Sequence, residues 1–270
     1  MTDKVIRHQY STGLSRCNIG QALASAGLDL DRLAPADLAA LEDFHTMGRI
    51  ATGRLVDLLE ITTDTRILDA GSGIGGSARF VASRYGCAVT AVDLTEEYCE
   101  INSWLNRLVG LDRQITVHQA DVTDLPFSEG GFDVVVSQHV QMNVADKGRL
   151  YREARRVLVE GGRIGLWDIT CGRDGDPDYP LPWADAPDVS HVVTSERLAA
   201  FIESSGFVIE RWVDLTEEAG SVMQKLLTVP PNPLGLHVFV AGFEEKARNL
   251  TDALSDRRLR VIQGVARAIA

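Results

Sequence analysis

A glycine-rich run follows an apolar segment in the first third of the chain. Residues 67–70 are Ile, Leu, Asp and Ala, and four of the next six residues, 71–76, are glycines. Glycine lets the backbone approach a ligand closely and adopt a positive φ at little steric cost. A helix that begins just after this run would present free N–H groups and a partial positive charge. The run therefore predicts a binding site for a nucleotide-like cofactor.

Two cofactor patterns overlap in the glycine run. The spacing of Gly71, Gly73 and Gly76 fits the dinucleotide fingerprint, in which a helix N-terminus holds a pyrophosphate. Asp69 counts against that occupant, because a carboxylate two residues before the first glycine would repel phosphates. The same carboxylate would suit a cationic group, such as the α-amino group of a methionine moiety.

Acids also follow the second and third apolar segments. Asp93 comes directly after residues 88–92, where an acid can accept hydrogen bonds from both hydroxyls of a ribose. Asp121 and Val122 come directly after residues 115–120, where they can accept from an adenine amino group and pack against the ring. Both acids have a second interpretation, because aspartate also favours turns and helix caps.

Polar residues end the next two apolar segments as well. Residues 132–137 lead into Gln138 and His139, and residues 164–167 lead into Asp168. Ligands of open α/β sheets bind outside the carboxyl ends of the strands. We therefore expect these polar ends to gather at one edge of a sheet.

This ordered series resembles the class I S-adenosylmethionine (SAM)-dependent methyltransferases, and within them the small-molecule branch. The resemblance covers about residues 45–215, well over half of the chain. It is carried by the acid-tipped glycine run, Asp93, Asp121 with Leu125-Pro126-Phe127, and Val157-Leu158 with Gly161-Gly162-Arg163. The chain is similar to glycine/sarcosine-, sugar/antibiotic- and sterol/quinone-type methyltransferases, and fold alone does not choose among their acceptors.

The resemblance implies an α/β fold. It is a Rossmann-like, seven-stranded, mostly parallel sheet with helices on both faces, in which residues 259–265 form an antiparallel last strand. The alternation of strand-like and helix-like segments up to about residue 215 independently favours a parallel sheet. We expect an N-terminal helical cap over residues 1–60 and a SAM-binding methyltransferase domain over residues 61–270. Residues 172–193 are rich in Pro, Gly and Asp, and we expect them to form a lid inserted after strand five.

The resemblance also assigns residues to the cofactor. It implies that Asp69 and the backbone of the glycine run hold the methionine part of SAM, Asp93 the ribose and Asp121 the adenine. In the helical cap, His45 or Arg49 would face the methionine carboxylate. The expected cofactor-binding residues are Asp69, Gly71, Ser72, Gly73, Gly75, Asp93, Leu94, Asp121, Val122, Gln138, Arg49 and His45.

His139 is the candidate catalytic residue. Methyl transfer is an in-line displacement at carbon, in which the cofactor brings the activation and the protein supplies positioning. A hydroxyl acceptor also needs a base, and a neutral imidazole with a pKa of about 6.5 can serve at neutral pH. An amine acceptor needs only to arrive uncharged. His191 in the expected lid is the alternative base, and a contact to the cofactor or a helix cap is the alternative role for His139.

The sequence thus predicts an enzyme that moves a methyl group from SAM to a hydroxyl or amine of a small-molecule metabolite and releases S-adenosylhomocysteine (SAH). A methyltransferase-fold enzyme with non-methylating, cyclase-like chemistry is one alternative. A nicotinamide-dependent reductase is another, and Asp69 counts against it. A non-catalytic SAM-binding protein is the fourth interpretation.

Composition narrows the partners. The 270-residue chain has 38 acids against 27 Lys and Arg, a net charge of −11, which disfavours a nucleic-acid partner. No apolar run approaches the length of a membrane span, and no membrane partner is expected. Four scattered cysteines show no metal-ligand spacing, which predicts no metal and a reduced, cytoplasmic setting. A homodimer formed through the N- or C-terminal additions is left open.

Overall fold

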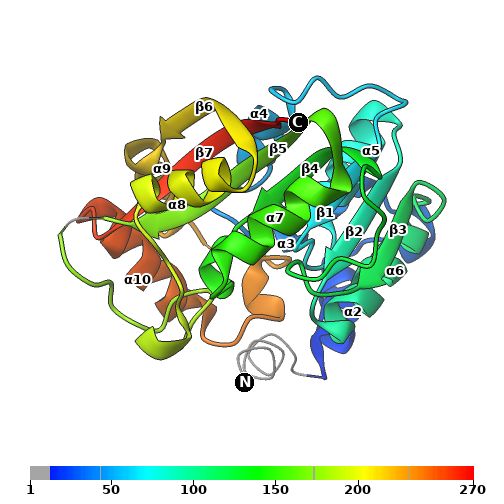
Figure 1. The fold of residues 1–270 in the computed structure, drawn as a ribbon. Coiled ribbons are helices and arrows are strands. Elements are labelled where there is room, and N and C mark those ends of the chain that lie inside the picture. Colours follow the sequence, from blue (N-terminus) through cyan, green and yellow to red (C-terminus); the bar gives the residue numbers. More distant parts are fainter. Residues whose placement is uncertain (1–12, 43, 173, 231) are drawn as a thin grey trace.

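A seven-stranded sheet runs through the centre of the computed structural model, which describes residues 13–42, 44–172, 174–230 and 232–270 (Figure 1). The strands are β1 (Ile67–Ala70), β2 (Val89–Asp93), β3 (Ile115–Gln119), β4 (Phe132–Gln138), β5 (Leu158–Cys171), β6 (Phe207–Asp214) and β7 (Leu259–Ala268). Their order is β3-β2-β1-β4-β5-β7-β6, and β7 runs antiparallel to both of its neighbours. The predicted α/β fold with a mostly parallel sheet is confirmed.

Helices cover both faces of the sheet. They are α2 (Ser15–Ser25), α3 (Ala39–Glu42), α4 (Gly48–Val56), α5 (Gly76–Tyr85), α6 (Glu96–Leu108), α7 (Lys147–Val157), α8 (Ser195–Ser204), α9 (Thr216–Leu226) and α10 (Phe243–Ser255). Residues of α4, α5, α9 and α10 share one buried apolar cluster with Val134 and Val136 of β4. Residues of α7 and α8 share another cluster with Val135. Successive strand side chains point to opposite faces, so these three valines contribute to two cores.

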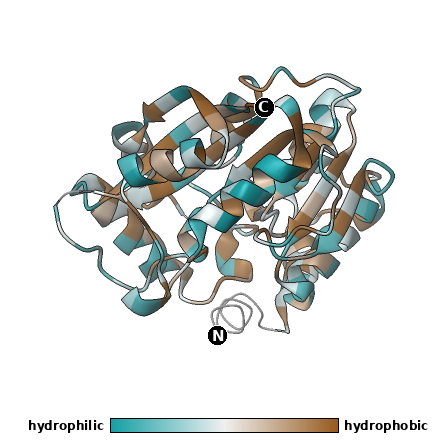
Figure 2. Cartoon of the chain, in the orientation of Figure 1, coloured by the Kyte–Doolittle hydropathy of each residue, from teal (hydrophilic) through white to brown (hydrophobic). Residues whose placement is uncertain are grey.

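The hydropathy of the strands follows from this double burial. In Figure 2 the central strands are largely brown, whereas α7 on the front face carries teal residues along its outer side. All four residues of β1 are buried. A parallel sheet covered on both faces needs apolar residues at consecutive positions, because neither face meets water.

Strand β5 is longer than predicted. It continues past Asp168 to Cys171 because β7 pairs with it along residues 163–171. Asp168 therefore pairs with Ile262 inside the sheet and is fully buried, so the expectation that it ends its strand is wrong. The end of β5 is set by its pairing with β7, a strand that is distant in the sequence, so it could not be predicted from the local sequence.

The described part of the expected N-terminal cap is a set of short helices. Besides α2, α3 and α4 it contains the 3-10 turns η1 (Leu30–Arg32) and η2 (Pro35–Leu38). Apolar residues of α2 and α3 pack against Ile101 and Leu105 of α6, whereas Ala51, Leu55 and Val56 of α4 belong to the cluster that contains Val134 and Val136 of β4. The boundary of the cap at residue 60 stays a prediction.

Residues 172–193 are attached to α10. Asn249 donates a hydrogen bond of 3.0 Å to the carbonyl of Pro180, and Lys246 forms an ion pair of 2.8 Å with Asp185. Leu181, Trp183 and Ala184 are buried in the same region. The lid function of this segment stays a prediction. Across the described ranges, none of the helices combines the length and apolar character of a membrane span.

One glycine marks the point where this segment leaves β5. A Cβ on Gly172 would lie 1.6 Å from the backbone oxygen of Arg257, so Gly172→Ala must displace one of two main chains. We expect a loss of about 1–3 kcal/mol in the free energy of unfolding, measured by urea denaturation. Gly20→Ala in α2 is the control, because its nearest neighbour would be Trp104 at 3.9 Å and helical alanine is favoured. Equal stability of Gly172→Ala and the parent would contradict the expectation.

Candidate active site

A cavity of about 310 Å³ opens at the carboxyl ends of β1, β2 and β4. All of the residues assigned to the site from the sequence line it, except Gly75 and Arg49. The assigned residues that line it are Asp69, Gly71, Ser72, Gly73, Asp93, Leu94, Asp121, Val122, Gln138, His45 and His139. Their individual roles stay predictions, but the fold brings them to one place.

The glycine loop approaches two other elements too closely for a side chain. The amides of Gly71 and Ser72 both donate to the carbonyl of Val92 at 2.8 Å, which holds the loop against β2. Gly71 has φ of 83°, and a Cβ there would lie 2.4 Å from Val140. Gly75, with φ of 94°, precedes α5 and packs against Asn102 rather than lining the cavity. The positive φ values explain why glycine stands at these positions.

A buried arginine supports the loop from below. Arg79 is fully buried and donates to the carbonyl of Ile74 and to the side-chain oxygens of Asn102 (3.2 Å) and Asn106 (2.7 Å). Asn102 in turn donates to the hydroxyl of Ser72, with 3.4 Å between nitrogen and oxygen. Sequence reasoning missed this network. The only feature of the sequence that could have indicated the network is the pair Asn102 and Asn106, which lie four residues apart on the inner face of α6.

Asp69 carries an unsatisfied carboxylate oxygen. The residue is 4% exposed, and its Oδ2 has no hydrogen-bond partner among the described residues. Burial, reinforced by the charge of Asp93, raises the pKa of Asp69 to about 7. The amide of Ala78 and the charge of Arg79 offset the burial only in part, so a cationic group at Oδ2 would stabilise the ionised form further. The site therefore fits the α-amino group that the sequence analysis placed here.

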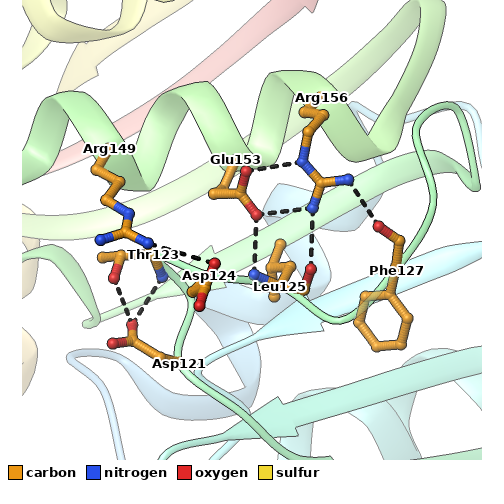
Figure 3. Close-up of polar contacts among 8 residues, drawn as sticks. All are labelled: Asp121, Thr123, Asp124, Leu125, Phe127, Arg149, Glu153 and Arg156. Atoms are coloured by element: carbon orange, nitrogen blue, oxygen red, sulfur yellow. Dashed lines mark hydrogen bonds and ion pairs between the residues drawn. The ribbon is translucent and has the colours of Figure 1, made fainter.

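Asp93 and Asp121 organise their own loops. Asp93 accepts hydrogen bonds of 2.8 Å from the amides of Gly73 and Thr95, and burial raises its pKa. Asp121 accepts from the amide (2.7 Å) and the hydroxyl (2.8 Å) of Thr123 (Figure 3). The turn interpretation of both acids is thus realised. Both acids also line the cavity, so a role in the turn and a role in ligand binding are compatible.

A clamp on α7 holds the loop that follows Asp121. Figure 3 shows Glu153 and Arg156 facing the backbone of residues 125–127. Glu153 accepts from the amide of Leu125 at 2.8 Å, and Arg156 donates to the carbonyls of Leu125 (2.9 Å) and Phe127 (2.6 Å). The two side chains form an ion pair of 2.7 Å, which lowers the pKa of Glu153. These contacts therefore join the loop that contains Leu125-Pro126-Phe127 to helix α7.

His139 has a defined hydrogen-bonding arrangement. Its amide donates to the carbonyl of Trp167 at 2.8 Å, and its φ is 54°. Its Nε2 lies 3.2 Å from the hydroxyl and 3.4 Å from the amide nitrogen of Thr46. Because a backbone N–H can only donate, Nε2 is the acceptor and the neutral ring carries its proton on Nδ1. Burial holds the pKa of His139 well below its usual value.

A second neutral histidine lies beside the first. Burial lowers the pKa of His45 to about 4, and its ring is 6.1 Å from that of His139. Its Nε2 is 3.0 Å from the hydroxyl of Thr52, which donates to Oε1 of Gln138 at 3.3 Å. Ser77 donates to the same oxygen at 2.8 Å, and Nε2 of Gln138 is buried without a partner in the described chain. These groups make the β4 end of the cavity polar but uncharged.

Two expected residues lie elsewhere. The guanidinium of Arg49 is 5.5 Å from the centre of the Phe80 ring, and Arg49 does not line the cavity. His191 donates its amide to the carbonyl of Met142 and also does not line the cavity. The arrangement thus favours His139 over His191 as the residue near the reacting groups.

Aromatic residues that the sequence analysis did not assign cover the cavity. Phe44 of the cap, Tyr98 of α6 and Phe239 all line it, and the rings of Tyr98 and Phe239 meet edge to face at 6.1 Å. Phe239 follows the 3-10 turn η5 (Leu236–Val238), far along the chain from the other lining residues. Its local sequence gives no signal of this placement.

The charges of the cavity wall have one sign. Asp69, Asp93, Asp121 and Asp146 line it, and no lysine or arginine does so among the described residues. In the same part of the chain, no group of three or more His, Cys, Asp or Glu is placed to hold a metal ion. Such a wall favours cationic ligands.

Residues 68–166 match a family model described as a methyltransferase domain. The match runs from β1 into β5 and includes the glycine loop, Asp93, Asp121 and His139.

Two relatives match about half of the chain. The sarcosine/dimethylglycine N-methyltransferase of Halorhodospira halochloris is 42% identical over 140 residues, which are 52% of this chain and 47% of that protein. The glycine/sarcosine/dimethylglycine N-methyltransferase of Actinopolyspora halophila is 37% identical over 127 residues, which are 47% of this chain and 22% of that protein. The chain therefore spans less than half the length of each of these relatives.

Solved structures share the fold over nearly the whole chain. A complex of geranyl diphosphate C-methyltransferase from Streptomyces coelicolor A3(2) with Mg²⁺, geranyl-S-thiolodiphosphate and SAH has a TM-score of 0.74 at 20% identity, and covers 99% of this chain and 98% of that one. The [4+2]-cyclase SpnF has a TM-score of 0.70 at 20% identity, and covers 100% of this chain and 97% of that one. At these identities the likeness concerns the fold.

The sheet order, the acid-tipped glycine loop and the matched domain define a class I methyltransferase domain. Residues 68–166 therefore belong to the methyltransferase domain family, and the chain is similar over about half of its length to small-molecule N-methyltransferases.

We expect Asp93→Ala to weaken SAH binding at least about tenfold, about 1.4 kcal/mol, because it removes the acid expected at the ribose and the support of the Gly73 amide. The measurement is calorimetric titration with SAH. Asp112→Ala, at an exposed position outside the cavity, is the control. Unchanged affinity in Asp93→Ala would remove the ribose role.

The raised pKa of Asp69, about 7, predicts a pH dependence of cofactor affinity. The ionised carboxylate is the form that attracts an amino group, so affinity should be full above the pKa and fall as pH drops from 8 to 6, approaching about tenfold per unit below the pKa. Titration with SAH at several pH values measures this. Asp69→Asn should flatten the pH profile, which would assign the pH dependence to Asp69 rather than to Asp93. A flat profile for the parent protein would contradict the expectation.

Proposed function

We propose that this chain transfers a methyl group from SAM to the nitrogen of a small-molecule amine and releases SAH. The observation that carries the cofactor assignment is the buried, unpaired Oδ2 of Asp69 at the tip of the glycine loop. Similarity to N-methyltransferases of glycine, sarcosine and dimethylglycine supports nitrogen as the acceptor atom.

Each part of the cofactor has a matching group in the cavity. Asp69 would hold the amino group, Asp93 the ribose hydroxyls and Asp121 the adenine amino group, with Leu94 and Val122 as apolar walls. When bound, SAM supplies a methyl group already activated on a sulfonium. The acidic wall attracts this cation, and the protein's own contribution is orientation and the exclusion of water.

The hydrogen bonding of His139 favours an amine over a hydroxyl. A hydroxyl acceptor needs a base in the transition state, whereas an amine needs only to arrive without its extra proton. Nε2 of His139 accepts from Thr46, and burial keeps its pKa low, so the ring is a weak base in this arrangement. In the tautomer that results, Nδ1–H is the donor that can orient the acceptor.

General-base catalysis by His139 is the second candidate role. It requires Nε2 to exchange its contact with Thr46 for the acceptor, and it would serve a hydroxyl acceptor. Non-methylating chemistry is the second candidate function, because the fold is also similar to that of the cyclase SpnF.

The size of the cavity, about 310 Å³, suits a small-molecule partner. A homodimer, the lack of a nucleic-acid partner and a cytoplasmic location stay predictions.

Incubation with methyl-labelled SAM and either sarcosine or dimethylglycine tests the proposal. We expect label on the amine nitrogen, detected by mass spectrometry of the product. Tight SAH binding without transfer of label to either amine would contradict methylation of these amines and favour the non-methylating alternative.

Two variants of His139 distinguish its roles with the same amines. His139→Gln keeps an N–H donor and should retain most of kcat if the ring orients the acceptor, whereas His139→Ala should lose it. If the ring is the base, both variants should lose about a hundredfold or more. SAH affinity is the control and should change little in either variant.

A further inference from the structure

A buried lysine lies behind the loop that follows β4. Lys147 is the first residue of α7, is 2% exposed and does not line the cavity. Its Nζ donates to the carbonyls of Gln141 at 2.8 Å and Val144 at 2.7 Å. Residues 143–146, next to these carbonyls, form one wall of the cavity. The ammonium group therefore ties the back of this wall to the start of α7.

A carboxylate from the sheet holds the same loop. Asp168 of β5 is fully buried, and its Oδ2 lies 3.5 Å from the backbone nitrogen of Gln141. The side-chain amide of Gln141 donates to the carbonyl of Ile169. Gln141 is therefore held through its N–H by Asp168, through its carbonyl by Lys147 and through its side chain by β5.

The two charges depend on each other. A buried ammonium and a buried carboxylate each lose hydration, and each is stabilised by the other's charge. Burial lowers the pKa of Lys147 to about 8 and raises that of Asp168 to about 7, and in each case the partner's charge opposes the shift. Removal of one partner would leave the other charge buried and unmatched.

The loop begins at His139, whose backbone is in an unusual conformation. A φ of 54° lies in the left-handed region, which is uncommon for residues other than glycine and persists only where the surroundings impose it. The hydrogen bond from its amide to Trp167 fixes one side of the residue. The anchoring of Gln141, two residues later, fixes the other side.

We propose that Lys147 and Asp168 are a pair of positioning residues that fix residues 140–146, and through them the orientation of His139 and one wall of the cofactor cavity. Neither residue lines the cavity, so both act through the loop. The activity readout of this proposal rests on the proposed function, whereas its structural readout does not.

Hydrogen–deuterium exchange of the full chain with bound SAH tests the structural part. Lys147→Met removes the ammonium and keeps the length of the stem. Lys147→Met/Asp168→Asn removes both charges together. Lys246→Met is the matched control, because Lys246 is also a buried lysine (7% exposed) paired with an aspartate, but on α10 and away from the cavity. We expect exchange of residues 140–146 to rise about tenfold or more in both Lys147 variants and to stay unchanged in the control.

Kinetics with dimethylglycine test the functional part. We expect kcat to fall about tenfold or more in Lys147→Met, while the Kd of SAH changes less than about threefold, because the residues expected at the cofactor's amino group and ribose are untouched. Lys147→Arg, which keeps a charged donor, should recover part of kcat. If the parent protein does not methylate dimethylglycine, the proposed function fails for this amine, and the exchange result still decides the positioning proposal.

Three results would overturn the proposal. The first is unchanged exchange of residues 140–146 in a folded Lys147→Met protein. The second is faster exchange spread evenly over the whole sheet. The third is failure of both Lys147 variants to fold while Lys246→Met folds, which would assign the pair to the stability of the domain as a whole.

Discussion

The burial of two carboxylates at neighbouring strand ends is the constraint around which the site is built. Asp69 is the penultimate residue of β1 and Asp93 is the last residue of β2, and desolvation raises the pKa of both carboxyl groups. The protein compensates with what it can place nearby, namely the amide of Gly73 for Asp93 and the charge of Arg79 for Asp69. Glycine is required at positions 71 and 75 of the same loop, because a Cβ there would lie 2.4 Å from Val140 and 2.1 Å from Asn102, respectively. The remaining deficit, at Oδ2 of Asp69, is what gives the site its preference for a cation.

The part of the cavity wall formed by His45 and His139 is polar but uncharged. His45 and His139 are kept neutral by burial, and hydroxyl and indole groups fix their rings. Trp167 donates to the hydroxyl of Thr46 at 2.9 Å, so a residue of the sheet sets the orientation of the cap residue that contacts His139. The cavity thus changes from acidic to neutral along its length. Under the proposed function, this change would separate the attraction of a charged cofactor from the handling of an amine that reacts in its uncharged form.

The sequence predicted those features that depend on local pattern. Apolar runs that end in Asp69, Asp93 and His139 predicted strands of a parallel sheet, and such strands bring their carboxyl ends to one edge. Features that depend on distant partners could not be predicted. Asp168 lies inside β5 because β7, almost a hundred residues later, extends the pairing, and Phe239 reaches the cavity only through tertiary packing. The contacts of Pro180 and Asp185 with α10 likewise could not be predicted from the Pro- and Gly-rich sequence of residues 172–193.

Helix α7 contacts two of the loops that line the cavity. Its first residue, Lys147, holds the loop after β4, and Glu153 and Arg156 hold the loop after β3 (Figure 3). A shift of this helix would therefore move both loops together. Phe44 and Phe239 line the cavity as well, and they come from segments outside these two loops. A substitution at Phe44 or Phe239 therefore changes the cavity wall at positions other than the two loops that α7 holds.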